Sequence, residues 1–191
     1  MSNLDELVQV VTARQRELGR PAIVGISGFG GSGKSTLARR LVAALPDAVR
    51  LRGDDFLDPV RVHRRSPDWD GVERDRLVDD VLRPFRDEVP GEFQRYDWDR
   101  GRLTEPEPVP RADVLVIDLV GLFHPTTLPL LDLAVWCEID LWTATQRGIA
   151  RDRDDGNDHD RVWTEVWEPN ERDFEQRFAP REVADVLFPT R

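Results

Sequence analysis

The chain has 191 residues, about one domain, and its 39% of hydrophobic residues is enough for a buried core without disulfides. Its 27 Lys and Arg residues against 37 Asp and Glu give a formal net charge of -10, which excludes a long nucleic-acid groove because phosphate backbones demand a basic face. Cys137 is the single cysteine, which excludes a disulfide framework and a cysteine-based zinc site.

The N-terminal residues are acidic and lack the basic start and apolar core of a signal peptide. No apolar run approaches the about 18 residues of a membrane helix. We therefore expect a cytoplasmic protein of a single domain over residues 1–191, with no nucleic-acid partner and no membrane partner. A homo-oligomer stays open.

The first half of the chain alternates apolar runs with helical patterns. Residues 4–18 carry apolar side chains at helical spacing, which predicts an amphipathic helix within an N-terminal segment 1–20. Residues 22–27 form a short apolar run typical of a buried strand, 34–45 predict a helix that Pro46 stops, and 48–51 predict a second strand. Residues 58–72 are irregular.

The second half continues the alternation. Residues 73–89 predict a helix that Pro84 kinks or splits, and 93–109 predict a small hairpin. Strands are expected at 114–118, 133–139 and 183–187, helices at 141–152 and 161–178, and a charged loop at 153–160. Pro169 must interrupt the helix over 161–178 or begin it afresh. This order predicts the α/β class with a mainly parallel central sheet.

A glycine-rich turn follows the first predicted strand and opens the next helix. It fits G-x-x-x-x-G-K-S/T with the residues Gly28, Phe29, Gly30, Gly31, Ser32, Gly33, Lys34 and Ser35, followed by Thr36. Glycines let several backbone amides point at one phosphate, and the helix adds its free N-terminal amides. The pattern predicts that Lys34 reaches the β- and γ-phosphates of a nucleotide and that Ser35 ligates Mg²⁺.

The lysine of this motif is unusual in this composition. Lys34 is the only lysine, so every other basic residue is an arginine. The position of the one remaining ammonium, inside a phosphate-binding pattern, favours a retained function over chance. We expect a nucleoside triphosphate in this loop.

Acids follow two predicted strands at the sheet edge where ligands bind in open α/β sheets. Asp118 ends the strand at 114–118 and can hold Mg²⁺, although a strand-end cap is an alternative. Asp54 and Asp55 follow the second strand, and either can act as general base or metal ligand, or the two form a solvated pair in a turn.

The chain resembles the uridine kinase-like branch of the P-loop kinases, which also holds pantothenate kinase and phosphoribulokinase. The resemblance rests on the loop at 27–36, on Gly53-Asp54-Asp55-Phe56, similar to the family's D-x-F, on the segments 67–70 and 96–100, and on 147–152, similar to the lid's R-x-x-x-R-D. Trp167-x-Pro169 and Ala184-Asp185 follow the lid motif. The resemblance implies a P-loop NTPase three-layer sandwich with a helical lid at 147–165 and an acceptor-binding excursion at 58–110.

The resemblance also implies roles for individual residues. Asp54 becomes the base and, with Ser35 and Asp118, a Mg²⁺ ligand. Asp70, Tyr96, Trp98 and Arg100 are implied on the acceptor side, and the lid arginines Arg147 and Arg151 beside the transferred phosphoryl group, where guanidinium groups can neutralise charge. From the residues alone, aromatic side chains are more often part of the hydrophobic core than of a ligand site, and the arginines also fit a solvated face of a helix.

The departures from the family fall mostly at acceptor contacts. Asp70-Gly71-Val72 stands where uridine kinases carry D-H-P, and Asp99, Arg100 and Arg102 stand where they carry a histidine and an arginine. The family's acid-plus-glycine after the strand at 114–118 is here Asp118-Leu119.

Other candidates look structural. His63, His124 and His159 show no metal-ligand spacing, and Trp136 and Trp142 flank a strand and are expected in the core. Trp163 and Trp167 share a helical face, which predicts packing first and lid contact second.

We expect an ATP- and Mg²⁺-dependent small-molecule kinase that phosphorylates a hydroxyl of a nucleoside, uridine-like, or a related metabolite. The alternatives are a nucleotide-dependent switch or assembly ATPase and a kinase-like protein without activity.

Overall fold

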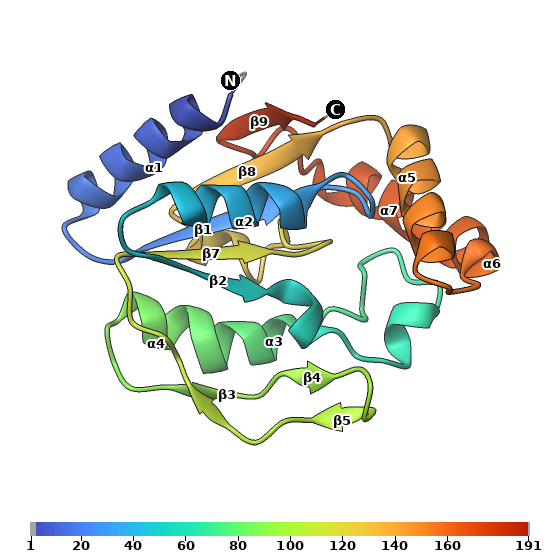
Figure 1. The fold of residues 1–191 in the computed structure, drawn as a ribbon, viewed down its shortest axis with the longest axis horizontal. Helices are drawn as coiled ribbons and strands as arrows, with labels where there is room; N and C mark the ends of the chain where they lie inside the picture. The colour runs from blue at the N-terminus through green and yellow to red at the C-terminus, as the bar shows by residue number, and fades with distance from the viewer. Residues whose placement is uncertain (1–2, 191) are drawn as a thin grey trace.

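The computed structural model describes residues 3–190, built around a five-stranded parallel sheet with strand order β2-β7-β1-β8-β9 (Figure 1). The strands are β1 (Ala22–Ser27), β2 (Ala48–Arg52), β7 (Val114–Asp118), β8 (Leu133–Glu138) and β9 (Val186–Pro189). The helices are α1 (Leu4–Leu18), α2 (Lys34–Ala44), α3 (Arg74–Leu77), α4 (Arg83–Arg86), α5 (Leu141–Asp154), α6 (Asp160–Val162) and α7 (Glu168–Phe178).

Two helices cover one face of this sheet. Figure 1 shows α1 and α2 on the same side, and their apolar residues Leu7 and Leu37 pack with alternate strand residues such as Val24 and Val116. The intervening positions, for example Ile23 and Leu115, belong to the core on the opposite face. This period-two division follows from the pleat of the strands and accounts for their continuous apolar runs.

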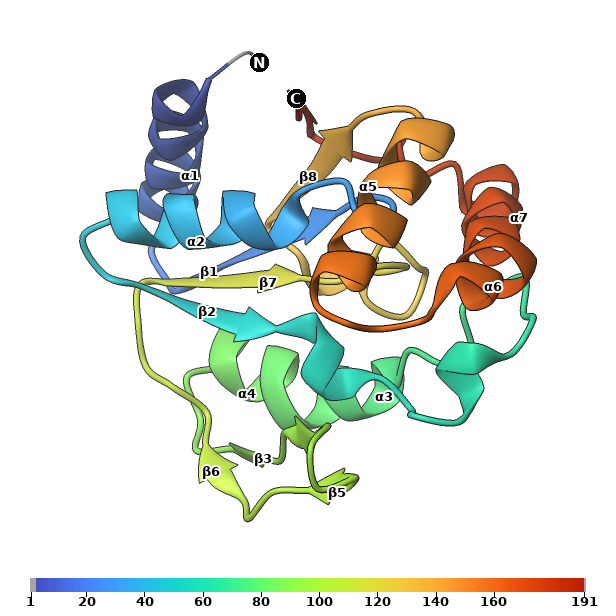
Figure 2. The same ribbon diagram turned by 45° about the vertical axis from the view of Figure 1, so that its right-hand side comes forward.

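The opposite face is covered by the segment Arg74–Arg86 and by short strands. Figure 2 shows α3 and α4 below the sheet, with β3 (Glu92–Phe93), β5 (Arg102–Leu103) and β6 (Glu107–Pro108) beyond them. The strands β4 (Tyr96–Asp97) and β5 form the antiparallel hairpin that the sequence predicts around residues 99–101. The predicted α/β three-layer architecture is therefore confirmed.

Both helix prolines are accommodated by a π-helical turn. The turn η3 (Val78–Leu82) precedes Pro84, and the turn η5 (Trp163–Trp167) precedes Pro169. The N–H of Arg83 donates to the carbonyl of Val78, five residues back. A proline ring clashes with the carbonyl four residues earlier in an α-helix, and a wider turn relieves that clash. The α-helical segments α4 and α7 therefore begin afresh at these prolines, as the sequence predicts.

Most predicted elements are confirmed, and two expectations are wrong. The last strand is Val186–Pro189, later than the predicted 183–187, and Asp185 just before it contacts β8, where its side chain accepts from the Ala134 N–H at 2.8 Å. Trp142 is 69% exposed rather than part of the core, since it lies on the outer face of α5, whereas Trp136 is buried as expected. No helix among residues 3–190 is both long and apolar enough to cross a membrane.

Candidate active site

The phosphate-binding loop connects β1 to α2 at the carboxyl edge of the sheet. Gly31 and Gly33 have φ angles of 78° and 90°, which L-residues with a side chain rarely adopt. A Cβ at Gly31 would lie 2.1 Å from the carbonyl oxygen of Ala144 in α5. The glycines of the motif are therefore required both by backbone conformation and by the close packing of the loop against α5.

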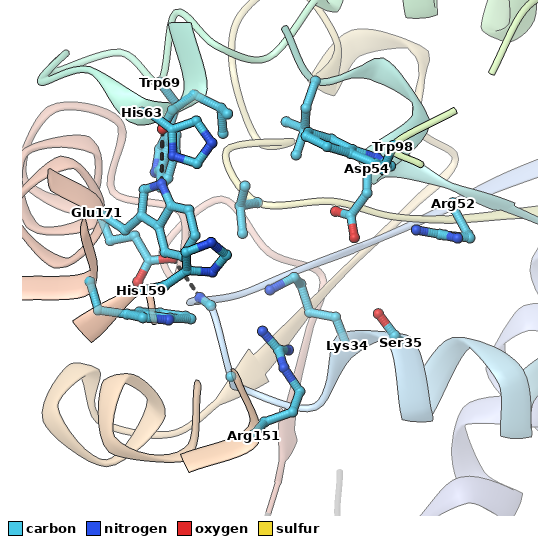
Figure 3. A pocket seen from close by; sticks show the side chains of 17 residues that line it. Lys34, Ser35, Arg52, Asp54, His63, Trp69, Trp98, Arg151, His159 and Glu171 are labelled. Atoms are coloured by element: carbon cyan, nitrogen blue, oxygen red, sulfur yellow. Dashed lines mark hydrogen bonds between the residues drawn. The ribbon is translucent and has the colours of Figure 1, made fainter. Parts of the chain in front are cut away.

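Lys34 lies over this loop. Its side chain is buried, and its Nζ donates hydrogen bonds to the carbonyl oxygens of Gly28 at 3.0 Å and Phe29 at 2.7 Å. Phe29 itself points into the core, where its ring packs against Trp136. The ammonium is thus held at the loop and faces the adjoining cavity (Figure 3).

Ser35 and Asp118 are in direct contact. The Ser35 hydroxyl donates to Asp118 Oδ2 at 2.6 Å, which joins the start of α2 to the end of β7. Arg50 of β2 donates to the same carboxylate through Nε at 2.6 Å and Nη2 at 2.9 Å. Hydrogen bonding to Asp118 raises the pKa of Arg50. The sequence analysis missed Arg50, although an arginine in the middle of a predicted buried strand is a signal that it must be paired.

The adjacent acids of the turn after β2 point in different directions. Asp54 lines the cavity and faces Lys34 (Figure 3). Although its side chain is open to the cavity, desolvation by the surrounding protein raises the pKa of Asp54, and the charge of Lys34 opposes this shift. Asp55 is buried away from the cavity and pairs with Arg95 at 3.0 Å. This geometry makes Asp54 the acid available to a ligand.

The cavity has a volume of about 450 Å³ and opens beside the loop. Its walls come from the loop, from the turns after β2 and β7, from residues 57–69, from the β4–β5 hairpin, and from the segment that runs from α5 to α7. The lining residues are Gly30, Gly31, Lys34, Ser35, Arg52, Asp54, Leu57, Val62, His63, Trp69, Trp98, Val120, Arg151, His159, Trp163, Trp167 and Glu171.

Asp152 connects three side chains that line the cavity. Its Oδ2 accepts from Trp163 Nε1 at 2.9 Å and lies 3.1 Å from His159 Nδ1, and its Oδ1 accepts from Arg151 Nη2 at 2.8 Å. Although burial opposes the shift, these hydrogen bonds lower the pKa of Asp152. The ring of Trp163 then fills the space above Gly30 and Gly148, where a Cβ would lie 2.7 Å and 2.3 Å from it.

Residues 61–68 are held against the turn η5 and the helix α7 by hydrogen bonds. Trp167 Nε1 donates to the Val62 carbonyl at 2.8 Å, and Asn170 Nδ2 donates to the Arg64 carbonyl at 2.8 Å. The Ser66 N–H donates back to Asn170 Oδ1 at 2.8 Å. These contacts couple residues 62–66 to the turn η5 and the helix α7.

The structure brings together residues that the sequence analysis treated as structural. His63 and His159 both line the cavity, with ring centroids 6.3 Å apart, and both rings contact Trp167. Trp69 and Trp163 line it as well. These residues are far apart in sequence, so no local pattern signals that they meet. Among residues 3–190 no group of three or more His, Cys, Asp or Glu side chains is arranged to hold a metal ion.

Several predicted site residues do not line the cavity. Asp70 is exposed, Tyr96 is half-buried with its ring against Trp98 at 4.8 Å, and Arg100 is exposed and pairs with Asp97 at 3.2 Å. Arg147 lies on α5 outside the lining set, whereas Arg151, one turn later, belongs to it. Of the predicted acceptor residues, Trp98 alone reaches the cavity wall.

The donor set fits Mg²⁺. Ser35 and Asp54 present a hydroxyl and a carboxylate to the cavity, and Asp118 is bonded directly to Ser35. Mg²⁺ prefers such oxygen ligands and usually retains several waters, so a site with few protein ligands suits it.

The chain is similar to known proteins in its sequence. A family model described as an AAA domain matches residues 23–177. The chain is 33% identical to a uridine kinase from Leuconostoc citreum (strain KM20) over 149 residues, which cover 71% of this chain and 70% of that protein. It spans smaller shares, 41% and 29%, of two other curated relatives.

Two solved structures share the fold. A possible uridine kinase from Bacillus stearothermophilus has a TM-score of 0.72 at 19% identity, covering 97% of this chain and 96% of that chain. A protein described as a fructose transport system kinase from Silicibacter sp. TM1040 has a TM-score of 0.76 at 23% identity, covering 98% and 99%. The predicted α/β sandwich with a phosphate-binding loop is therefore confirmed.

Proposed function

Because the chain belongs to the uridine kinase-like P-loop kinases, we propose that it transfers the γ-phosphoryl group of ATP to a hydroxyl of a nucleoside or a related small metabolite. One observation carries the proposal: Lys34 of the phosphate-binding loop and Asp54 face each other across the same cavity (Figure 3). A cation for the phosphates and a base for the acceptor are thus on opposite sides of the space where transfer takes place.

The residues of the loop bind and orient the nucleotide. Lys34 exchanges its bonds to the loop carbonyls for the β- and γ-phosphates, and the amides at the start of α2 surround the phosphates. Ser35, Asp54 and Asp118 would hold Mg²⁺, which supplies neutralisation of phosphate charge when bound.

Asp54 accepts the proton of the acceptor hydroxyl. The hydroxyl oxygen forms a bond to the γ-phosphorus, the bond between the γ-phosphorus and the bridging oxygen breaks, and ADP leaves with that oxygen. The raised pKa of Asp54 favours this proton transfer, because a base works best when its pKa approaches the working pH. Arg151 on the cavity wall stabilises the negative charge that develops on the transferred phosphoryl group. We assign the same role to Arg147, the other arginine of the lid motif.

We assign the excursion at 58–110 to the acceptor and the segment 147–165 to the lid. The cavity wall includes Trp98 beside Asp54 (Figure 3) and Trp69, whose flat faces suit a planar ring, which supports a nucleoside acceptor. The names of the relatives from Leuconostoc citreum and Bacillus stearothermophilus point the same way. Asp70, Tyr96 and Arg100 remain predicted acceptor contacts.

The test is ATP consumption, with Mg²⁺, against a panel of nucleosides, sugars and vitamins. We expect turnover that depends on one acceptor, that disappears in Asp54→Asn and that falls at least tenfold in Arg151→Gln. Arg153→Gln is the matched control, because Arg153 pairs with Asp160 and does not line the cavity. Hydrolysis without an acceptor supports a switch or assembly ATPase instead, and ATP binding without turnover supports an inactive kinase-like protein.

A further inference from the structure

Glu171 is a buried acid beside the phosphate-binding loop that the proposed mechanism does not use. It lies in α7 and is 4% exposed. Its Oε1 accepts a hydrogen bond from the backbone N–H of Gly30 at 2.5 Å (Figure 3). An acid from the C-terminal helix therefore fixes one amide of the loop from outside.

The second oxygen of this carboxylate has no partner. Within residues 3–190, Glu171 Oε2 is buried and makes no hydrogen bond, although the side chain belongs to the wall of the cavity. A buried charged group with an unfilled hydrogen-bonding position is costly, so such groups are retained where a ligand or a proton completes them.

The charges around Glu171 determine its protonation. Burial raises the pKa of Glu171 to about 7, with Glu168 and Glu175 of the same helix acting in the same direction. The charge of Lys34 and the hydrogen bond from Gly30 oppose the shift. The other titratable or charged side chains on the cavity wall are Arg52, Asp54, His63, Arg151 and His159.

A triphosphate in the loop brings several negative charges next to this carboxylate and engages Lys34, the cation that favours its ionised form. Both changes favour the neutral acid. Protonation at Oε2 removes the repulsion and converts the unpartnered acceptor into a donor, while Oε1 still accepts from Gly30.

We propose that Glu171 is a positioning residue of the phosphate-binding loop that fixes the Gly30 amide and takes up a proton from solvent when the nucleoside triphosphate binds. This inference rests on the proposed function, since it requires that ATP occupies the loop. It makes nucleotide affinity depend on pH through a residue that does not touch the reacting atoms.

The experiment is calorimetric titration with Mg²⁺ and a non-hydrolysable ATP analogue at pH 7.5, in two buffers of different ionisation enthalpy. We expect the wild-type chain to take up between about half and about three quarters of a proton per nucleotide at this pH, because a carboxyl with a pKa of about 7 is already partly protonated before binding. Its Kd should weaken by a factor approaching about tenfold per pH unit above pH 7.5. Glu171→Gln keeps the shape and an oxygen for Gly30, so it binds the analogue with nearly no proton uptake and a flat pH profile. Glu182→Gln, at an exposed acid outside the lid segment and the cavity wall, keeps the wild-type values.

Two results overturn the inference while leaving nucleotide binding intact. One is binding of the ATP analogue to the wild-type chain without proton uptake, which contradicts the inference regardless of the result for Glu171→Gln. The other is unchanged uptake in Glu171→Gln, which assigns the proton to another group such as His63 or His159. Absence of any binding heat in the wild-type chain overturns the proposed function itself, so the two failures are distinguishable.

Discussion

Arg50 and Asp118 form a two-point contact between neighbouring strands, with Nε 2.6 Å from Oδ1 and Nη2 2.9 Å from Oδ2. Asp118 also accepts from Ser35, so one carboxylate connects β2, β7 and the first turn of α2. The strand register explains the meeting, because β2 and β7 are parallel neighbours with Arg50 opposite Val116. The side chain that positions Asp118 beside Ser35 is therefore supplied by a different strand.

Arg50→Gln should lower the free energy of unfolding by about 3–5 kcal/mol, because removing one partner of a buried ion pair leaves the other charge unpaired. Both side chains are largely buried, 18% and 4% exposed. Urea unfolding followed by tryptophan fluorescence measures the change. Arg83→Gln is the matched control, since its pair with Asp79 is exposed, and its midpoint should hardly move. Equal effects of the two variants would contradict this account.

Gly31→Ala should abolish nucleotide binding, and Gly156→Ala should not affect it. Both glycines have φ near 78°, so both substitutions carry the same backbone strain. They differ in space, because a Cβ at Gly31 meets the Ala144 carbonyl at 2.1 Å and a Cβ at Gly156 meets nothing within 4 Å. Calorimetry with Mg·ATP checks the contrast, and a Gly31→Ala chain that binds normally would show that the loop tolerates displacement from α5.

The stability of the wild-type chain should fall with rising pH relative to Glu171→Gln. Burial raises the pKa of Glu171 from an ordinary 4.5 to about 7 in the folded state, so the folded chain binds the proton more tightly than the unfolded chain. The stabilisation from this group is complete below pH 4.5 and is lost as the pH rises through 7. The difference amounts to at most about 3 kcal/mol.

Chemical unfolding of both chains at several pH values between 4.5 and 8 measures this difference, and Glu165→Gln serves as an exposed control. Parallel stability profiles of the wild-type chain and Glu171→Gln would mean that Glu171 titrates at its ordinary value in the folded state.

Trp98→Ala should raise the KM for the acceptor about tenfold or more and leave the Kd for Mg·ATP unchanged. The side chain is 43% exposed and lines the cavity from the β4–β5 hairpin, which we propose contacts the acceptor. Loss of a base-sized stacking surface weakens acceptor binding without a large cost to the fold. Trp142→Ala, which removes a 69% exposed ring outside the cavity, should change neither constant. An unchanged KM in Trp98→Ala would remove the hairpin from the acceptor site.

The local chemistry of the site was predictable because it is encoded in consecutive residues. The loop at 28–35 needs glycines where the backbone turns and one lysine beside them. This pattern is a run of consecutive residues, so a single sequence is enough to identify it. The sheet was predictable for a similar reason, since buried parallel strands are short apolar runs between helices. The identity of the acid that faces the cavity, Asp54 rather than Asp55, needed the family resemblance at first and is explained by the geometry of the turn.

The walls of the cavity were decided by tertiary structure. His63, His159 and Trp167 meet because the C-terminal helix binds residues 61–68 through backbone carbonyls, and a hydrogen bond to a carbonyl leaves no signature in side-chain pattern. Arg50 and Glu171 act through partners 68 and 141 positions away. Sequence by itself determines which structure and chemistry short segments can have, because secondary-structure propensity and motif chemistry are local. Which segments face one another depends on the packing of the whole chain. That packing places the tryptophans, the histidines and Glu171 around the cavity beside the phosphate-binding loop.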